Sequence, residues 1–99
     1  MTEKLSYKII HNEPHGQWEI QVAPDNRVIG YLSYDLNDTE IFFTSTVVRR
    51  EYQGQGLATE LVRTAFEAVK AEGKRKIVPI CSFVQKFATQ NPGYPIAAE

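Results

Sequence analysis

Residues 52–58 read Tyr52-Gln53-Gly54-Gln55-Gly56-Leu57-Ala58. The hydrophobic pattern of the chain changes period at this point. Before it, apolar and polar residues alternate, which is typical of half-buried strands; after it, apolar residues recur at helical spacing. Two glycines therefore stand between a predicted strand and a predicted amphipathic helix.

The part of the chain before the loop predicts four strands. Leu5, Tyr7 and Ile9 alternate with polar residues in the first, and the others cover residues 17–22, 28–36 and 41–48. The fourth carries apolar or β-branched residues on both faces, so we expect it to be buried on both sides, as a central strand is. Turn signals at residues 14–16, 24–26 and 37–38 predict an antiparallel meander.

The part after the loop predicts a helix, a strand and a second helix. The apolar face of the first helix is formed by Leu57, Leu61, Val62, Ala65, Phe66 and Val69, and Gly73 follows as a C-terminal cap. A short strand at residues 77–80 contains Pro79, and a helix around residues 83–88 ends before Pro92. Because a long helix joins two strands, we expect the fifth strand to lie parallel to the fourth. The predicted fold is α+β: a mixed sheet of five strands with two principal helices.

Composition narrows the class of protein. The chain has 99 residues, of which 42% are hydrophobic and 23% charged, which predicts one soluble domain over residues 1–99. A net charge of −1 argues against a nucleic-acid surface. Cys81 is the only cysteine, so an intrachain disulfide and a cysteine-based metal site are excluded. With no apolar run long enough for a signal peptide or a membrane span, we expect a cytoplasmic protein without membrane contact.

The glycine loop is a candidate anion site. Glycine allows positive φ and lets a ligand approach the backbone, and the first amides of a helix lack internal partners. A strand, a glycine loop and a helix N-terminus together can hold a phosphate or a diphosphate. Gly54 and Gly56 would also suit a plain tight turn. The loop contains neither the Gly-Lys-Ser/Thr of a Walker loop nor the third glycine of a dinucleotide-binding fingerprint.

Three short motifs resemble the GNAT (general-control-related N-acetyltransferase) superfamily. Residues 53–58 match its acetyl-CoA signature, Gln/Arg-x-x-Gly-x-Gly/Ala. Pro79-Ile80-Cys81-Ser82-Phe83-Val84 is similar to the Pro-x-Cys-x-Phe/Tyr-Val segment of the minimal subfamily, and Asn91-Pro92-Gly93-Tyr94 resembles its closing Asn/His-Pro-x-Tyr. The resemblance covers residues 40–95. That subfamily lacks the usual helices between the first two strands.

The resemblance implies that acetyl-CoA or CoA binds as a co-substrate, with no metal. Backbone amides of residues 54–58 would hold the pyrophosphate, and the pantetheine arm would bind the backbone near Val48, where the fourth and fifth strands splay apart. Arg49 and Arg50 are either phosphate contacts or solvated surface. The predicted cofactor-binding residues are Val48, Arg49, Arg50, Gln53, Gly54, Gln55, Gly56, Leu57, Ala58 and Asn91.

The resemblance also implies acetyl transfer to a primary amine. Many GNAT enzymes protonate the leaving thiolate with a tyrosine of the last helix, but the comparable residues here are Phe83 and Phe87. Cys81 is the predicted catalytic residue, as an acid or as an acetylated nucleophile, unless it is only a small buried hydrophobe. We expect direct transfer, because no histidine is recognisably paired with the thiol.

A general base is not evident in the sequence. Where the minimal subfamily often has His-Thr-Glu-Val in the fourth strand, this chain has Ser45-Thr46-Val47-Val48. The remaining titratable residues are His11, His15, Asp35, Asp38 and Glu40, and no spacing singles out one of them. Three hypotheses stay open: an N-acetyltransferase for an amine of a small molecule or protein, a non-catalytic CoA-binding module, and an interaction domain that keeps only the fold. The acceptor amine and the oligomeric state are not predicted.

Overall fold

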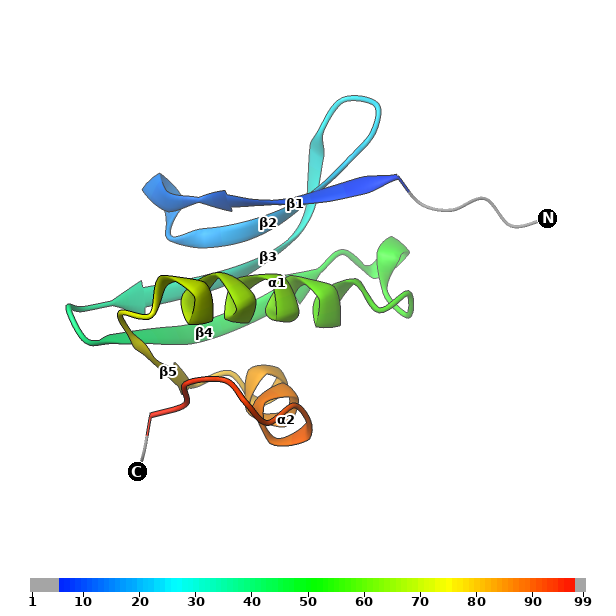
Figure 1. Cartoon of the computed structure of the whole chain (residues 1–99). Coiled ribbons are helices and arrows are strands. Elements are labelled where there is room, and N and C mark those ends of the chain that lie inside the picture. Colours follow the sequence, from blue (N-terminus) through cyan, green and yellow to red (C-terminus); the bar gives the residue numbers. More distant parts are fainter. Residues whose placement is uncertain (1–5, 98–99) are drawn as a thin grey trace.

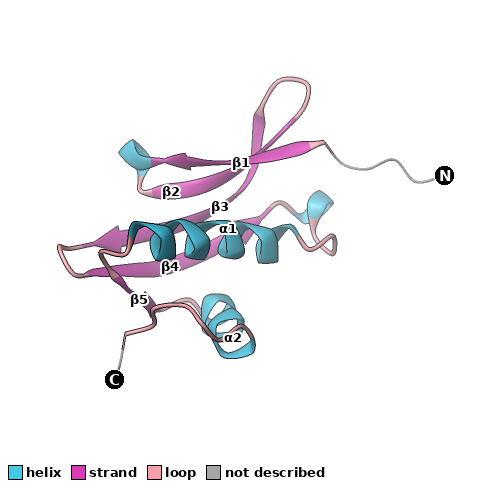
Figure 2. Cartoon of the chain, viewed as in Figure 1, coloured by secondary structure: helices cyan, strands magenta, loops and turns pink. Residues whose placement is uncertain are grey.

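A computed structural model describes residues 6–97 of the chain (Figures 1 and 2). The elements in chain order are β1 (Tyr7–Asn12), η1 (Glu13–His15), β2 (Gln17–Val22), β3 (Arg27–Leu36), β4 (Glu40–Val48), η2 (Arg50–Tyr52), α1 (Leu57–Glu72), β5 (Lys76–Pro79) and α2 (Ser82–Gln90). Leu5, which was expected in the first strand, lies outside the described residues. The fifth strand begins and ends one residue earlier than predicted, and the second helix is slightly longer.

The predicted mixed sheet is confirmed. Its five strands lie in the order β1-β2-β3-β4-β5, with antiparallel pairing except between β4 and β5, which are parallel. The crossover between β4 and β5 contains α1, as the hydrophobic pattern predicts. A single 3-10 turn, η1, joins β1 to β2.

A β-bulge divides β4 into two halves. Ser33 pairs with Ser45 and the next residue, Tyr34, pairs with Phe43, so Thr44 is the extra residue. An extra residue reverses which side chains face each side of the sheet. Phe43 faces the core before the bulge, whereas Thr46 takes that face after it, opposite the buried Leu32.

The core lies between the sheet and α1. Gly73 ends this helix in the left-handed conformation, with φ of 69°, and its amide donates to Val69, which confirms the predicted cap. Phe66 of α1 contacts Phe43 of the sheet, with ring centroids 5.5 Å apart. Phe66 belongs to the apolar face that the sequence predicts for this helix, so the burial of the helix against the sheet follows from its amphipathic pattern.

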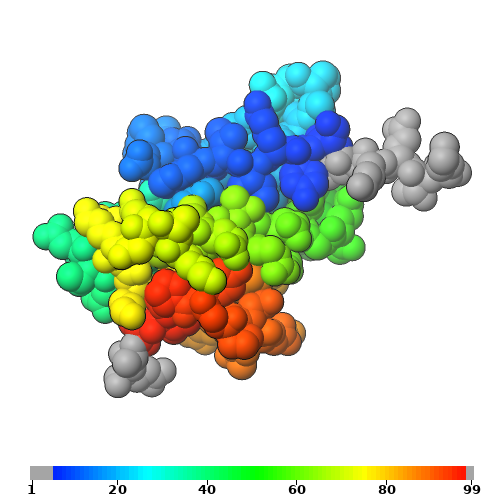
Figure 3. Space-filling model, in the orientation of Figure 1, coloured from blue at the N-terminus to red at the C-terminus, as the bar shows by residue number. Residues whose placement is uncertain are grey.

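The second helix and the segment after it pack along one side of α1 (Figure 3). Phe87 meets Phe66 edge-on, with ring centroids 5.2 Å apart, and the Arg63 guanidinium lies 5.3 Å from the Phe87 ring. The Tyr94 hydroxyl donates to the Glu67 carboxylate over 2.6 Å. The helix face that carries Arg63 and Glu67, which is outside the predicted apolar face, is therefore partly covered.

The opposite face of the sheet is uncovered in the second half of β4, so the expected burial on both sides is wrong there. Val47 is 42% exposed, and Ser45 is exposed as well. Within residues 6–97 both α-helices lie elsewhere: α1 covers the other face and α2 lies beside β5 (Figure 1).

Candidate functional site: the glycine loop and the end of the fourth strand

The glycine loop follows η2 and enters α1 without a side-chain cap. Gly54 and Gly56 have φ angles of 82° and 77°, which residues with a Cβ rarely adopt. A Cβ built on either glycine would meet no atom within 4 Å, so the loop faces open space. The two glycines are needed for the backbone conformation and leave the approach to the loop open.

The amides of this loop are largely without acceptors. Tyr52 donates to Arg49 and Gln53 donates to Arg50, which closes η2, and the next bonded amide is that of Glu60, on the Gly56 carbonyl. In residues 6–97, the amides of residues 54–59 have no acceptor, and no side chain caps α1. The helix dipole places partial positive charge at the same point. Six neighbouring backbone donors are therefore available to an anion at this end of the helix.

Gln53 differs from the other predicted cofactor-binding residues of the loop. Its amide is used inside η2, and its side-chain Nε2 donates to the Val48 carbonyl over 2.9 Å. Gln53 thus ties the loop to the last residue of β4. Leu57 contributes a buried side chain to the core, and only its backbone amide is free for a ligand.

Three arginines lie near the loop. Arg49 and Arg50 are exposed on its N-terminal side. Arg27, at the start of β3, donates from Nη2 to the Tyr52 hydroxyl over 2.7 Å. Sequence reasoning missed Arg27, because only strand pairing brings it beside a loop 25 residues away in the chain.

Parallel pairing between β4 and β5 stops midway along β4. The last pair is Phe43 with Pro79, and the Phe43 carbonyl then accepts from the amides of both Ile80 and Cys81, each over 3.0 Å. Further on, the Arg49 amide donates to Ile29 of β3. Because backbone groups alternate along a strand, those of Thr46 and Val48 face away from β3, on the side where β5 has ended. The opening therefore exposes backbone hydrogen-bonding groups of β4 with which an extended polar chain can pair.

Cys81 lies at the mouth of this opening, as the residue before α2. Its Sγ is 3.6 Å from the Thr46 Oγ1. Burial raises the pKa of the Cys81 thiol, but hydrogen bonds from the Val84 amide, the Thr46 hydroxyl and the Phe83 and Thr46 amides together lower the pKa below its ordinary value. Sequence reasoning missed Thr46, because its orientation depends on the bulge.

Asn91 directly follows α2 and lines a small hollow near the glycine loop. Its Nδ2 donates to the Phe87 carbonyl over 2.9 Å, which leaves the side-chain oxygen as an acceptor. The hollow has a volume of about 210 Å³ and lies between Thr59 of α1 and the face of α2 that carries Phe83 and Lys86. Asn91 is therefore on the same side of the molecule as the first turn of α1.

The candidate bases are not gathered at Cys81. His11 stacks on Trp18, with ring centroids 4.0 Å apart, and its Nε2 lies 2.6 Å from the Tyr34 hydroxyl. His15 bonds Asn12 in the turn between β1 and β2. Asp35 and Asp38 are exposed near the β3–β4 turn, and Glu40 lines a groove beside β5.

Comparison with known proteins identifies the family. The chain matches the GCN5-related N-acetyl-transferase family over residues 17–97. The glycine loop, the opened strand and this match agree, and the chain belongs to the GCN5-related N-acetyltransferase family. No curated protein sequence matches it.

Solved structures share the fold. A GNAT family N-acetyltransferase from Escherichia coli in complex with CoA is 15% identical, with a TM-score of 0.65, over 80% of this chain and 64% of that one. A GCN5-like protein from Staphylococcus aureus is 25% identical, with a TM-score of 0.62, over 84% and 78% of the two chains. A GNAT family acetyltransferase from Elizabethkingia anophelis with acetyl-CoA bound is 13% identical, with a TM-score of 0.56, over 90% and 74%. The chain thus spans less than two thirds of the E. coli protein.

Two further findings concern residues 6–97. No helix there is long and apolar enough to cross a membrane. No three side chains of His, Cys, Asp or Glu in that range are grouped as metal ligands would be.

Proposed function

We propose that this protein is an acetyl-CoA-dependent N-acetyltransferase that transfers acetyl directly to a primary amine. The observation that carries the proposal is the run of unpaired amides at residues 54–59, which continues into the opened half of β4 and ends beside Cys81. The fold supports the same conclusion, because the chain belongs to a family of acetyltransferases. A cytoplasmic location is part of the proposal and is compatible with a free thiol at Cys81.

In this proposal the loop binds the diphosphate of CoA through backbone amides. Each hydrogen bond to a charged group contributes about 1.5–3 kcal/mol, so two or three of them suffice for a useful affinity. Arg49, Arg50 and Arg27 add positive charge around the loop. The pantetheine arm would follow the backbone of β4 near Val48, and the Asn91 side-chain oxygen is available to the same ligand.

The chemistry takes place where β4 and β5 separate. The amine nitrogen attacks the thioester carbon, an N–C bond forms, and the C–S bond breaks. The Thr46 amide bonds the Cys81 sulfur, so the Val48 amide, which also faces the open side of β4, is the donor for the developing oxyanion. The proton lost by the amine ends on the CoA sulfur, and we assign Cys81 as the group that passes it on. A lowered pKa suits this role, because a proton donor works best when its pKa lies near the operating pH.

Three kinds of measurement test the proposal. Calorimetric titration with acetyl-CoA should give binding that Gly56→Val abolishes, and CoA thiol release should accelerate when an acceptor amine is added. Cys81→Ala should lower turnover while CoA affinity stays nearly unchanged. Mass spectrometry of the protein incubated with acetyl-CoA alone should find no acetyl group on Cys81. A rapidly formed acetyl-cysteine that an amine then discharges would contradict direct transfer.

One observation favours a second candidate, the non-catalytic CoA-binding module. His11 is engaged with Trp18 and Tyr34, and His15 with Asn12, so neither histidine is placed to serve Cys81. If acetyl-CoA binds and stabilises the protein but no amine in a broad panel is acetylated, this alternative replaces the enzyme.

A further inference from the structure

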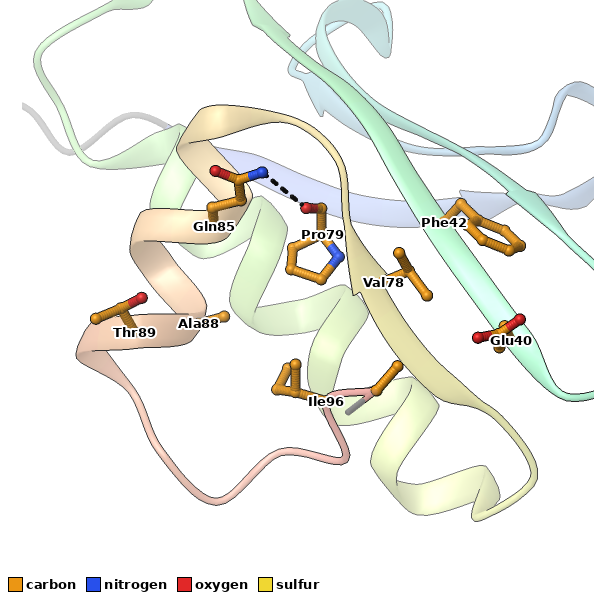
Figure 4. A pocket seen from close by; sticks show the side chains of 9 residues that line it. Glu40, Phe42, Val78, Pro79, Gln85, Ala88, Thr89 and Ile96 are labelled. Carbon is orange, nitrogen blue, oxygen red and sulfur yellow. Dashed lines mark hydrogen bonds between the residues drawn. The ribbon is translucent and has the colours of Figure 1, made fainter. Parts of the chain in front are cut away.

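The two edges of the sheet differ in what covers them. At the β5 edge, the Ile77 amide donates to the Pro95 carbonyl and the Ala97 amide donates to the Ile77 carbonyl. Ile96, between those two residues, also lines the groove beside β5 (Figure 4). At the other edge, β1 pairs only with β2 among residues 6–97 (Figure 1). The outward backbone groups of β1 are therefore without partners in the described part of the chain.

The bonding between β1 and β2 shows which backbone groups of β1 point outward. The Ala23 amide donates to the Ser6 carbonyl, so Ser6 is one of the residues whose backbone groups are directed at β2. Such residues alternate along an antiparallel strand with residues whose N–H and C=O groups point the other way. The outward residues are therefore Tyr7, Ile9 and His11. The strand contains no proline and no register shift, two of the devices that commonly protect an edge from pairing.

A stack of aromatic rings also ends at this edge. His11 stands opposite Trp18 of β2, and the two rings are parallel to within 6°, with centroids 4.0 Å apart. Because the rings belong to facing residues of neighbouring strands, the stacking direction runs across the strands. The Tyr34 hydroxyl meets the His11 ring at Nε2, which is on its rim. The outer face of this exposed ring is thus turned toward the place that an added strand would occupy.

A second copy of β1 provides an aromatic residue at the matching position. In an antiparallel pair centred on Ile9, each Ile9 stands opposite its own copy, and Tyr7 of each chain stands opposite His11 of the other. All the residues that face one another in this way have outward backbone groups, and together they would exchange about six hydrogen bonds. Tyr7 is 40% exposed in the single chain, and its ring would lie against the outer face of His11.

The charge on β1 also bears on this register. Lys8 would stand opposite Ile10 and not opposite its own copy. The two Lys8 residues would then be diagonal neighbours, about 7–8 Å apart. Their repulsion opposes the pairing and is screened by salt, so we expect a weak association that salt strengthens. One short strand from each copy also makes a small interface, of the size found in transient complexes.

We propose that two copies of this chain associate through β1, in antiparallel register about Ile9, so that their sheets become continuous. The association does not depend on the proposed activity, because the opening beside Cys81 lies between β4 and β5, on the other side of the sheet. That opening would stay accessible in the dimer.

Sedimentation and NMR test this association in the unmodified protein. Sedimentation should show the monomer giving way to a dimer between about 10 µM and 1 mM, as in other weak complexes. Over the same range the amide proton signals of Tyr7, Ile9 and His11 should move downfield, because their N–H groups gain acceptors. The amides of Lys8 and Ile10, already bonded to β2, should move much less. A protein that is still monomeric at about 1 mM, or shifts without this alternation, would overturn the proposal.

The register has its own test in a sample of mixed labelled and unlabelled chains. Within one chain Tyr7 and His11 are four residues apart on a strand, or about 13 Å, which is too far for an NOE between their rings. In the proposed dimer an NOE between these rings should appear, and only between different chains. A dimer that lacks this NOE pairs through another surface or in another register, and the proposal is then wrong.

Variants with opposite expected effects complete the test. Tyr7→Ala should raise the dimer Kd about tenfold, because two cross-strand aromatic pairs are lost. The matched control is Val28→Ala on β3, an equally exposed side chain away from this edge, which should leave Kd unchanged. Lys8→Thr should lower Kd about twofold or more and remove its salt dependence, a gain that misfolding cannot produce. Equal Kd values for Tyr7→Ala and Val28→Ala, or a weaker dimer in Lys8→Thr, would contradict the β1 interface.

Discussion

Gly56→Ala is the substitution that most directly tests the anion site. Gly56 has φ of 77° and stands immediately before α1, and a Cβ there would touch nothing within 4 Å. The variant therefore introduces backbone strain without a clash in the free protein. A non-glycine residue in the left-handed region costs about 1–2 kcal/mol, which lowers the Tm of a domain of this size by about 4–16 °C.

Gly73→Ala is the matched control at the other end of the same helix. Its φ is 69° and a Cβ there also meets nothing within 4 Å, so the cost to stability should be similar. Gly73 is the C-terminal cap of α1 and is remote from the glycine loop. Thermal unfolding should thus give comparable losses for the two variants.

Affinity for CoA should separate them. A methyl group at residue 56 would project toward the diphosphate and displace it from about one or two amides. At about 1.5–3 kcal/mol for each bond to a charged group, Kd should rise by about tenfold or more in Gly56→Ala. Calorimetry should find the Kd of Gly73→Ala unchanged within about twofold, after correction for any unfolded fraction. Equal affinities of the two variants would refute the assignment of the loop as the diphosphate site.

Three further predictions concern Cys81 and the core. Thr46→Val removes a hydrogen bond that lowers the pKa of Cys81, so this pKa should rise and the pH profile of iodoacetamide alkylation should move to higher pH. Ser45→Ala, on the opposite face of β4, should leave that profile in place. Cys81→Ser should restore little of the turnover lost in Cys81→Ala, because a hydroxyl has a far higher pKa than a thiol; full activity in either variant would make Cys81 structural. Phe87→Ala should lower the free energy of unfolding by about 3–5 kcal/mol in urea titrations, because it removes a buried ring that contacts Phe66; a loss below about 1 kcal/mol would contradict the described packing.

The order of the elements could be predicted from local patterns. Alternation in the first half and helical spacing from Leu57 onward placed every strand and both helices to within a few residues, and Gly73 marked the end of α1. These features depend on residues that are close together in the sequence, so local patterns are enough to predict them. The burial of both faces of β4 was predicted wrongly at Val47, because side-chain composition does not say which layers cover a strand.

The sequence by itself determined the mixed sheet, the position of the glycine loop and the choice of Cys81 as the thiol to consider. Only the tertiary structure decided the surroundings of that thiol and the opening beside it. The bulge at Thr44 turns Thr46 toward Cys81, and the start of α2 brings the Val84 amide to the same sulfur. Strand pairing likewise brings Arg27 to Tyr52. These contacts join residues that are far apart in the chain or depend on the register of one strand against another, and no local pattern encodes a register shift of one residue.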